Sequence, residues 1–134
     1  MIVSDYGEIL REEILSLPPL GAFNIHASVL PSYRGAAPVV HAILNGDQAT
    51  GVTLFRIERG LDTGPVVACA GAEIGAEETA GELEERLAVL GAGLLAQQLP
   101  LIAAGEAGGE PQDESRASLA PKISKADGLI DWNH

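Results

Sequence analysis

The chain has 134 residues, a length that fits one domain of ordinary size with a buried core. Its hydrophobic fraction is 46% and its charged fraction 20%, a composition typical of a folded domain. The formal net charge is −11, from 8 Lys and Arg against 19 Asp and Glu. This acidity excludes a broad binding surface for DNA or RNA, because phosphate binding depends on clustered Lys and Arg.

Targeting, disulfide and metal patterns are not recognisable in the sequence. The first ten residues, MIVSDYGEIL, do not place an apolar run after a basic stretch, so they do not resemble a signal peptide. The one cysteine, Cys69, cannot form an internal disulfide, and no Cys/His cluster has the spacing of a zinc site. The apolar stretch at 87–104 is interrupted by two glutamines and a proline, which makes it a poor membrane span. We therefore expect a cytoplasmic protein without a metal or a membrane partner.

The first half of the chain predicts two short strands and two helices. Met1–Val3 has the pattern of the end of a buried strand, and Glu8–Leu15 predicts a short amphipathic helix that two consecutive prolines stop. Gly21–His26 predicts a second strand. After a loop rich in proline and glycine, Pro38 suits the first turn of a helix that Asn45 and Gly46 close.

The second half predicts two strands and a long helix. Thr50–Ile57 and Pro65–Ile74 have strand patterns, and the connection ERGLDTG between them is turn-like. Thr79 and Glu82 fit a capping box that opens the helix, and we expect Pro100 to bend or break it. Strands that alternate with helices indicate the α/β class.

The last thirty residues predict a different kind of structure. Residues 105–134 are polar and rich in turn-forming residues, which predicts a linker-like tail that ends in a short anchor at Leu129–Trp132. Cys69 is expected in the core. Because the chain opens in what looks like the tail of a strand, residues 1–134 are predicted to form one partial domain.

Three polar residues are placed where they could carry chemistry. Asn24 and His26 are two apart in an extended segment and so share a face, and Asp62 lies in a glycine-flanked turn. An amide, an imidazole and a carboxylate suffice for acyl transfer, because they can stabilise an oxyanion, move a proton and orient the imidazole. No serine or cysteine nucleophile is set up for a covalent route. From spacing alone, two structural alternatives to a catalytic role remain. Asn24 and His26 would then be a structural pair at a strand end, and Asp62 an ordinary turn residue.

The run FNIHASVLPSYRGAAP, followed by GVTLFRIERGLDTG, resembles the catalytic core of the folate-dependent formyltransferases. The hallmark of that family is an Asn-x-His pair, a Ser-Leu-Leu-Pro segment and a distant Asp, which Asn24, His26, Ser28–Pro31 and Asp62 match in order. The segments RGAAP and LDTG, and the tail PKISKADGLIDW, resemble the corresponding segments of the family members that formylate methionyl-tRNA. The resemblance extends from Tyr6 to Trp132.

The chain also departs from the pattern of this family. It lacks the first half of the family's Rossmann-like domain and the C-terminal barrel that helps to hold the tRNA. Val29 replaces the usual leucine, which keeps an apolar side chain there, and Asp5 stands where the family usually has a small residue. The resemblance therefore implies the C-terminal half of a Rossmann-like formyltransferase domain with a mixed, mostly parallel sheet.

The reaction that the resemblance implies moves a formyl group from 10-formyltetrahydrofolate to the amino group of methionyl-initiator tRNA, without a metal. It assigns proton transfer to His26, donation to the formyl oxygen to Asn24, and support of the charged form of His26 to Asp62. The residues implied to line the folate pocket are Ser28, Val29, Leu30 and Pro31. Arg34 would either contact the tRNA end or brace the loop through a carboxylate.

Other functions would use the same three site residues, and the missing strands predict an assembly. A formyltransferase acting on a sugar nucleotide or a purine precursor, or a folate hydrolase, would share the Asn-His-Asp set. An inactive folate-binding remnant would contain it as well. The missing strands would leave an unpaired sheet edge at Met1–Val3, so we expect a homo-oligomer through that edge. Because the net charge is −11, we expect weak tRNA binding by this chain alone.

Overall fold

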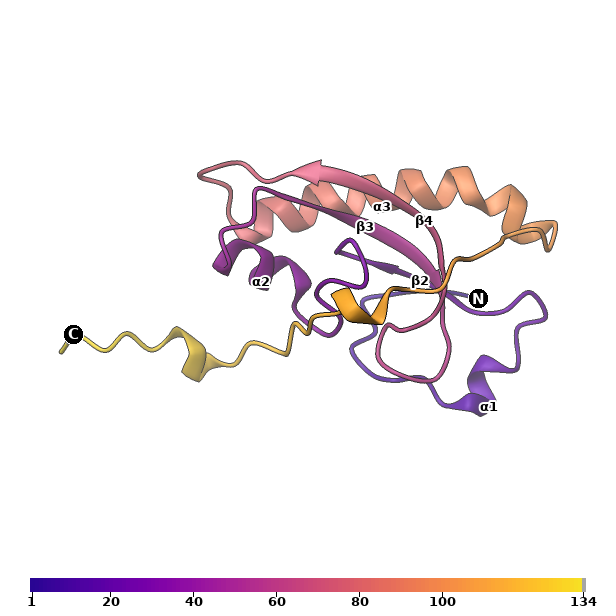
Figure 1. Cartoon of the computed structure of the whole chain (residues 1–134), viewed down its shortest axis with the longest axis horizontal. Helices are drawn as coiled ribbons and strands as arrows, with labels where there is room; N and C mark the ends of the chain where they lie inside the picture. Colours follow the sequence, from indigo (N-terminus) through magenta and orange to yellow (C-terminus); the bar gives the residue numbers. More distant parts are fainter. Residues whose placement is uncertain (134) are drawn as a thin grey trace.

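The computed structural model, which describes residues 1–133, is organised around one four-stranded sheet in the order β1-β2-β3-β4 (Figure 1). The strands are β1 (Ile2–Ser4), β2 (Phe23–His26), β3 (Ala49–Arg56) and β4 (Val66–Glu73). β1 pairs with β2 in parallel, whereas β3 is antiparallel to both of its neighbours. All four strands lie within two residues of the segments that the sequence predicts.

The pairing of the strands confirms a mixed α/β fold and corrects one part of the prediction. The sheet is not mostly parallel, because only the β1–β2 pairing among these strands is parallel. For the antiparallel pairing of β3 with β4, the physical reason lies in the connection between these two strands. That connection is the short turn around Asp62, and a short turn returns the chain antiparallel, whereas a parallel return needs a longer crossover.

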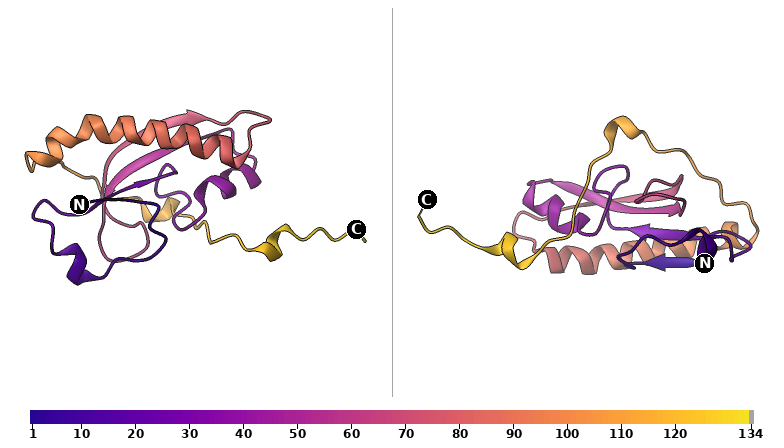
Figure 2. Two further views of the ribbon diagram at one scale, coloured as in Figure 1. Left: turned by 180° about the vertical axis from the view of Figure 1, so that it is seen from behind. Right: turned by 90° about the horizontal axis from the view of Figure 1, so that it is seen from below.

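The long helix α3 (Ala80–Ala103) covers one face of the sheet (Figure 2). The predicted capping box is present: the Thr79 hydroxyl accepts from the Glu82 amide at 3.3 Å, and the Glu82 carboxylate accepts from the Thr79 amide at 2.9 Å. Contrary to expectation, Pro100 does not break the helix, which continues to Ala103. Pro100 removes the one backbone hydrogen bond that would reach Ala96, and Ile102 beyond it packs in the core, so packing holds the last turn in place.

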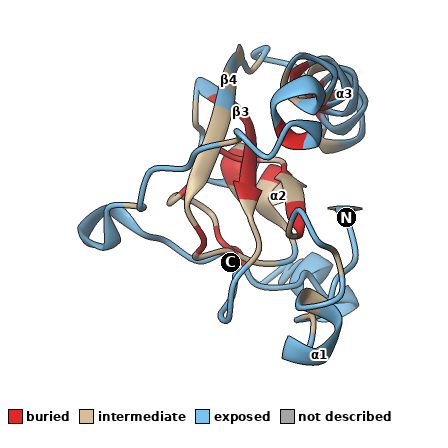
Figure 3. Cartoon of the chain, turned by 90° about the vertical axis from the view of Figure 1, so that its right-hand side faces the viewer, coloured by how far each residue is buried: buried red, intermediate tan, exposed pale blue. Residues whose placement is uncertain are grey.

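The core forms between this helix and the two middle strands. Buried residues gather on β3, on the inner side of α3 and on α2 (Pro38–Leu44) (Figure 3). The cluster consists of Phe23, Val39, Val52, Leu54, Leu83, Leu87, Leu94 and Ile102. Its members on α3 recur at helical spacing, and burial of each leucine stabilises the fold by about 1.5–3 kcal/mol.

The first helix is shorter than the sequence predicts. α1 spans Glu12–Leu15, and the residues before it are irregular. Its N-cap, Arg11, makes no side-chain capping bond, and Ile9 is exposed to solvent. An amphipathic helix gains most of its stability from packing its apolar face, which is missing at this point.

The chain after α3 returns to the sheet and then leaves it. We call Glu110–Ala120 the strap: Glu110 pairs with Val66 of β4, and Leu119 forms a bridge with Arg34. The strap includes the short 3-10 helix η1 (Glu114–Arg116). The expected linker-like character of residues 105–134 therefore does not apply to this segment.

Beyond the strap, the chain runs away from the sheet and includes the 3-10 helix η2 (Lys125–Gly128) (Figures 1 and 2). Trp132 is 86% exposed, and Leu129 and Ile130 are exposed too, so the expected anchor is wrong for these residues. Cys69 is also exposed rather than in the core, because its side chain alternates away from α3 on the edge strand β4.

α3 also meets a length-and-composition test for a membrane span, with a mean hydropathy of 1.4 over its most apolar 18-residue window. Core helices pass the same test. Leu83, Leu87 and Leu94 of this helix belong to the cluster that packs on the sheet, so the packing accounts for part of its apolar character.

Candidate functional site

His26 ends β2 and is nearly buried, with 7% of the residue exposed. Its Nε2 lies 2.8 Å from the carbonyl oxygen of Tyr33. Because a carbonyl can only accept, Nε2 carries the hydrogen of this bond. Nδ1 lies 3.7 Å from Oδ2 of Asp62, within ion-pair range but beyond hydrogen-bond distance. Nδ1 is therefore the ring nitrogen that remains available to exchange a proton.

Asp62 reaches His26 from the turn between β3 and β4. Its backbone has a φ of 54°, in the left-handed region that aspartate tolerates better than most residues. Its Oδ2 accepts a hydrogen bond from the Gly35 amide at 2.8 Å. The side chain is 14% exposed. The structure thus brings together two of the predicted residues that are 36 positions apart in the sequence.

Asn24 lies two residues before His26 on β2, on the same side of the strand by alternation. It is half-buried and stands opposite Val3 of β1 and Phe55 of β3. A donor at this position faces the same side of the sheet as the imidazole. The three residue types predicted for acyl transfer therefore come from one strand and one turn.

The segment Ser28–Pro31 is a loop fixed to the sheet by Thr53. The Thr53 hydroxyl donates to the Ser28 carbonyl at 2.6 Å and accepts from the Leu30 amide at 3.1 Å. Ser28 and Leu30 are buried, whereas Val29 is 42% exposed. Of these three, Val29 has the side chain most available to a ligand, and Ser28 and Leu30 shape the loop behind it.

Arg34 is held within the protein rather than presented to solvent. The residue is 6% exposed, and its guanidinium donates to both carboxylate oxygens of Glu114, at 2.8 and 2.7 Å. These bonds raise the pKa of Arg34 and lower the pKa of Glu114. The geometry favours the bracing alternative for Arg34 over direct contact with a tRNA.

Three further residues complete the site, and the sequence patterns do not identify them. Tyr33 offers a backbone carbonyl to His26, and Gly35 offers an amide to Asp62. Gln112, in the strap, donates to the carbonyl oxygens of Asp62 and Gly64. Backbone groups leave no trace in side-chain chemistry, and the polar surroundings of Gln112 predicted a linker.

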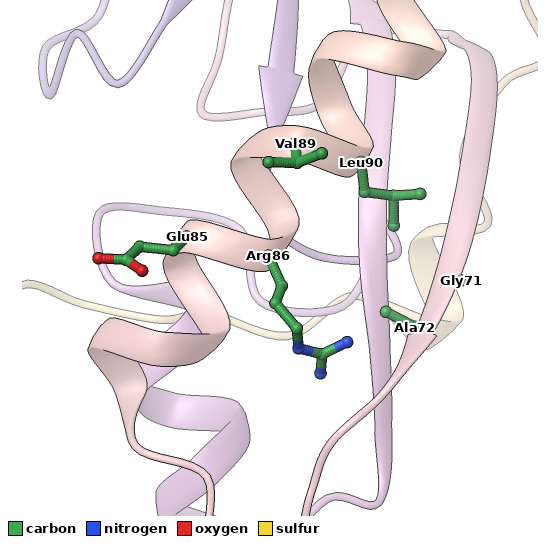
Figure 4. A pocket seen from close by; sticks show the side chains of 6 residues that line it. All are labelled: Gly71, Ala72, Glu85, Arg86, Val89 and Leu90. Carbon is green, nitrogen blue, oxygen red and sulfur yellow. The ribbon is translucent and has the colours of Figure 1, made fainter.

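Other parts of the structure add no comparable chemistry. Among the described residues, no three His, Cys, Asp or Glu side chains are grouped so that they could hold a metal ion. A groove of about 600 Å³ lies between α3 and β4, lined mainly by apolar atoms and by Arg86 (Figure 4). Arg86 is engaged there by Glu78, which lowers the pKa of Glu78 to about 2. The groove contains none of the predicted site residues.

Comparison with known proteins identifies relatives across the whole chain. A family model described as "Formyl transferase" matches residues 1–99. The methionyl-tRNA formyltransferase of Dictyoglomus turgidum is 51% identical over 133 residues, which are 99% of this chain and 42% of that relative. That of Solibacter usitatus is 51% identical over 132 residues, with 98% and 42% covered. The chain thus spans about two fifths of the length of the curated relatives that it matches.

A solved structure shows the same fold. The formyltransferase PseJ from Anoxybacillus kamchatkensis superposes with a TM-score of 0.80 and 30% identity, over 90% of this chain and 62% of that one. Its crystal structure is a complex with UDP-4,6-dideoxy-4-formamido-L-AltNAc and tetrahydrofolate.

Proposed function

Because the chain belongs to the formyl transferase family, we propose that it carries the formyl-transfer site of a methionyl-tRNA formyltransferase. The formyl donor would be 10-formyltetrahydrofolate, and the acceptor would be the α-amino group of methionine on initiator tRNA. The observation that carries this proposal is the 51% identity to a methionyl-tRNA formyltransferase over 133 residues, which are 99% of the chain.

The transfer needs one bond to form and one to break. The amine attacks the formyl carbon, so that a new C–N bond forms and the formyl oxygen becomes a tetrahedral oxyanion. The bond from the formyl carbon to N10 of the folate then breaks, and N10 receives the proton that the amine loses. Proximity and fixed dipoles would supply most of the rate, because both reactants are held by the same site.

Asn24 would donate a hydrogen bond from its side-chain amide to the developing oxyanion. A donor that is in place before the reaction needs no reorganisation, and one such donor contributes ~3 kcal/mol, or about 100-fold in rate. Its position on β2 supports this role, since a strand holds a side chain more rigidly than a loop.

His26 would carry the proton from the amine to N10, through Nδ1. Nε2 is held by the Tyr33 carbonyl, so the ring keeps its orientation while Nδ1 gains and loses a proton. Asp62, at 3.7 Å from Nδ1, would stabilise the imidazolium that forms in between. The nearly buried setting of this pair strengthens the electrostatic effect.

The folate would lie against the Ser28–Pro31 loop, with Val29 contributing an exposed apolar side chain. The tetrahydrofolate in the related PseJ structure supports a folate donor for this chain. The same relative, with its formylated sugar nucleotide, supports a second candidate acceptor, the amino group of a sugar nucleotide.

The decisive experiment compares acceptors. The chain is incubated with 10-formyltetrahydrofolate and either methionyl-initiator tRNA, an amino sugar nucleotide or glycinamide ribonucleotide, and the formylated products are separated by mass. We expect formylmethionyl-tRNA in the wild type and loss of most of it in His26→Ala and Asp62→Ala. Transfer to the sugar nucleotide alone would support the second candidate. Folate binding without transfer to any acceptor would identify an inactive remnant.

Binding of the tRNA by this chain alone is expected to be weak. A net charge of −11 opposes a polyanion, and Arg34 is already paired with Glu114. Filter binding at low salt measures this directly. Tight binding that weakens steeply with added salt would mean that a local basic site suffices.

A further inference from the structure

Gln112 occupies a point where three segments of the chain meet. Its carboxamide nitrogen donates to the Asp62 carbonyl at 2.8 Å and to the Gly64 carbonyl at 2.7 Å. Its carboxamide oxygen accepts from Nε and Nη2 of Arg34, at 3.2 and 2.8 Å. Both hydrogens and both lone pairs of the amide are thereby used.

From these contacts we infer that Gln112 is a positioning residue, which sets the place of Asp62 opposite His26 from the strap. The inference rests on the proposed function, since it assigns Gln112 to the formyl-transfer site. Asp62 has a left-handed backbone, and its carbonyl is one of the two that Gln112 holds. Fixing this carbonyl fixes the direction in which the Asp62 side chain leaves the turn.

The sheet also confines the turn, which restricts how the turn can move if its hydrogen bonds to Gln112 are lost. Gly64 is buried, and a Cβ at that position would lie 1.7 Å from the backbone oxygen of Arg56. One side of the turn therefore packs directly on the end of β3. Gln112 holds two backbone carbonyls of the same turn, so the backbone that carries the Asp62 side chain is held by both the sheet and the strap.

The strap itself is fastened at both ends, which gives Gln112 a rigid base. Glu110 exchanges two hydrogen bonds of 2.8 Å with Val66. At the other end, Ser118 accepts from the Arg34 amide at 2.8 Å, and Ala120 donates to the Arg34 carbonyl at 2.7 Å. A side chain between two fixed points can hold a turn, whereas a side chain on a free tail cannot.

The chemistry at this position requires an amide. In Gln112→Glu, one carboxylate oxygen can still accept from Arg34, so the strap stays attached. The other oxygen has no hydrogen to give and faces two carbonyl oxygens, so the two bonds to the Asp62 turn are lost. This variant separates the positioning of Asp62 from the attachment of the strap. Gln97→Glu, the same change at an exposed site on α3, is the matched control.

The first readout is the Gly35 amide signal in a proton–nitrogen NMR spectrum, because this amide donates to Oδ2 of Asp62 at 2.8 Å. Asp62→Ala marks where the signal lies when the contact is gone. We expect the signal of Gln112→Glu to move from the wild-type position toward this reference, and that of Gln97→Glu to stay. Gln112→Met, which is of similar length and uncharged, is measured in its place if the first variant does not fold.

The second readout is formyl transfer to methionyl-tRNA. We expect kcat of Gln112→Glu to fall about 10- to 100-fold, because a shift of about 1 Å in a catalytic group can cost about 100-fold. KM for the formyl donor should change less than twofold. An unmoved Gly35 signal, or a kcat equal to that of Gln97→Glu, would overturn the inference. A wild type without transfer activity refutes the proposed function instead, and the Gly35 signal then decides the role of Gln112 by itself.

Discussion

At the scale of single residues, Thr53 joins the sheet to the loop that is expected to receive the folate. Its hydroxyl is fully buried, with a donor bond to Ser28 and an acceptor bond from Leu30. Because Ser28 and Leu30 are buried, water cannot replace the Thr53 hydroxyl as the partner of the Ser28 carbonyl and the Leu30 amide. One hydroxyl in the centre of β3 thus fixes the geometry of a loop more than twenty residues earlier in the chain.

Thr53→Val keeps the shape of the side chain and removes both bonds. We expect a loss of about 1–3 kcal/mol in the free energy of unfolding, because two backbone groups are left buried and unpaired. Urea denaturation followed by circular dichroism measures the loss. Thr50→Val, a buried position on the same strand whose hydroxyl does not hold the loop, is the control. Equal effects of the two changes would contradict the assignment.

The candidate site shows which residues a sequence can reveal. Asn24, His26 and Asp62 have polar side chains in a recognisable order, so the sequence could propose them as candidates, and the structure places His26 and Asp62 3.7 Å apart. Gln112 could not be proposed in this way, because its hydrogen bonds to the Asp62 and Gly64 carbonyls exist only in the folded chain. Bracing by a carboxylate is one alternative that the sequence offers for Arg34, but the sequence could not identify the partner, because Glu114 lies 80 positions away.

At the scale of elements, the contact of α3 with the sheet depends on a glycine. Gly91 is buried, and a Cβ there would lie 2.9 Å from Cγ2 of Ile25 on β2. Gly93, on the same helix, is exposed, and a Cβ there would meet nothing within 4 Å. Substitution of Gly91 therefore meets a steric obstacle, whereas substitution of Gly93 does not.

Replacement of each glycine by alanine tests this packing. Gly93→Ala should raise the free energy of unfolding by about 0.5–1 kcal/mol, since alanine favours a helix interior. Gly91→Ala gains the same helix propensity but crowds Ile25, which can cost about 1–3 kcal/mol, so we expect no gain or a net loss. Thermal and urea unfolding compare the two variants. A stabilised Gly91→Ala would mean that α3 lies farther from the sheet.

The ion pair between Arg34 and Glu114 makes the attachment of the strap depend on pH. Arg34 holds the pKa of Glu114 below its ordinary value of 4.5, chiefly through their hydrogen bonds. A lowered folded-state pKa contributes stability that is complete above the unfolded pKa and is lost as the pH falls through the folded pKa. The free energy of unfolding of the wild type minus that of Glu114→Gln should be constant from pH 7 to about 5, and should shrink at lower pH.

Urea denaturation across this pH range measures the difference. Glu85→Gln, at an exposed position of α3, is the control for a general change in net charge. A difference between wild type and Glu114→Gln that grows as the pH falls would contradict the sign of the effect.

The elements themselves were largely predictable, and the exceptions have physical causes. Thr79 and Glu82 mark the start of α3 in the sequence because the capping box is a local interaction. The shortened α1 and the unbroken helix at Pro100 depend on what packs around each segment, which no local pattern contains. The docking of the strap depends in the same way on residues far along the chain.

At the scale of the whole molecule, β1 forms one edge of the sheet and pairs only with β2 among the described strands. Met1 and Ile2 are 40% and 38% exposed, and further exposed apolar residues follow in the next segment of the chain. These are Tyr6, Ile9, Ile14, Leu17 and Leu20. An open strand edge beside apolar surface favours association with another strand.

We therefore expect this chain to form a homo-oligomer through the β1 edge at micromolar concentration. Sedimentation velocity measures the assembly, and Ile2→Lys should shift it toward the monomer by placing a charge on the edge. Val89→Lys places the same charge on the exposed side of α3 and should leave the assembly unchanged. A compact wild-type monomer at these concentrations would contradict the expectation.

The position of the strap has a consequence for how the site comes into being during synthesis. A chain leaves the ribosome N-terminus first, so His26, Asp62 and all of α3 emerge before Gln112 and Glu114 do. The sheet and its covering helix can therefore assemble while the Asp62 turn still lacks its hold. The contacts of the strap span up to 87 positions, between Ser118 and Pro31, and such distant contacts are slow to form. In a nascent chain the sheet and α3 would therefore form first. The Asp62 turn would reach its final position last, when the strap docks on it.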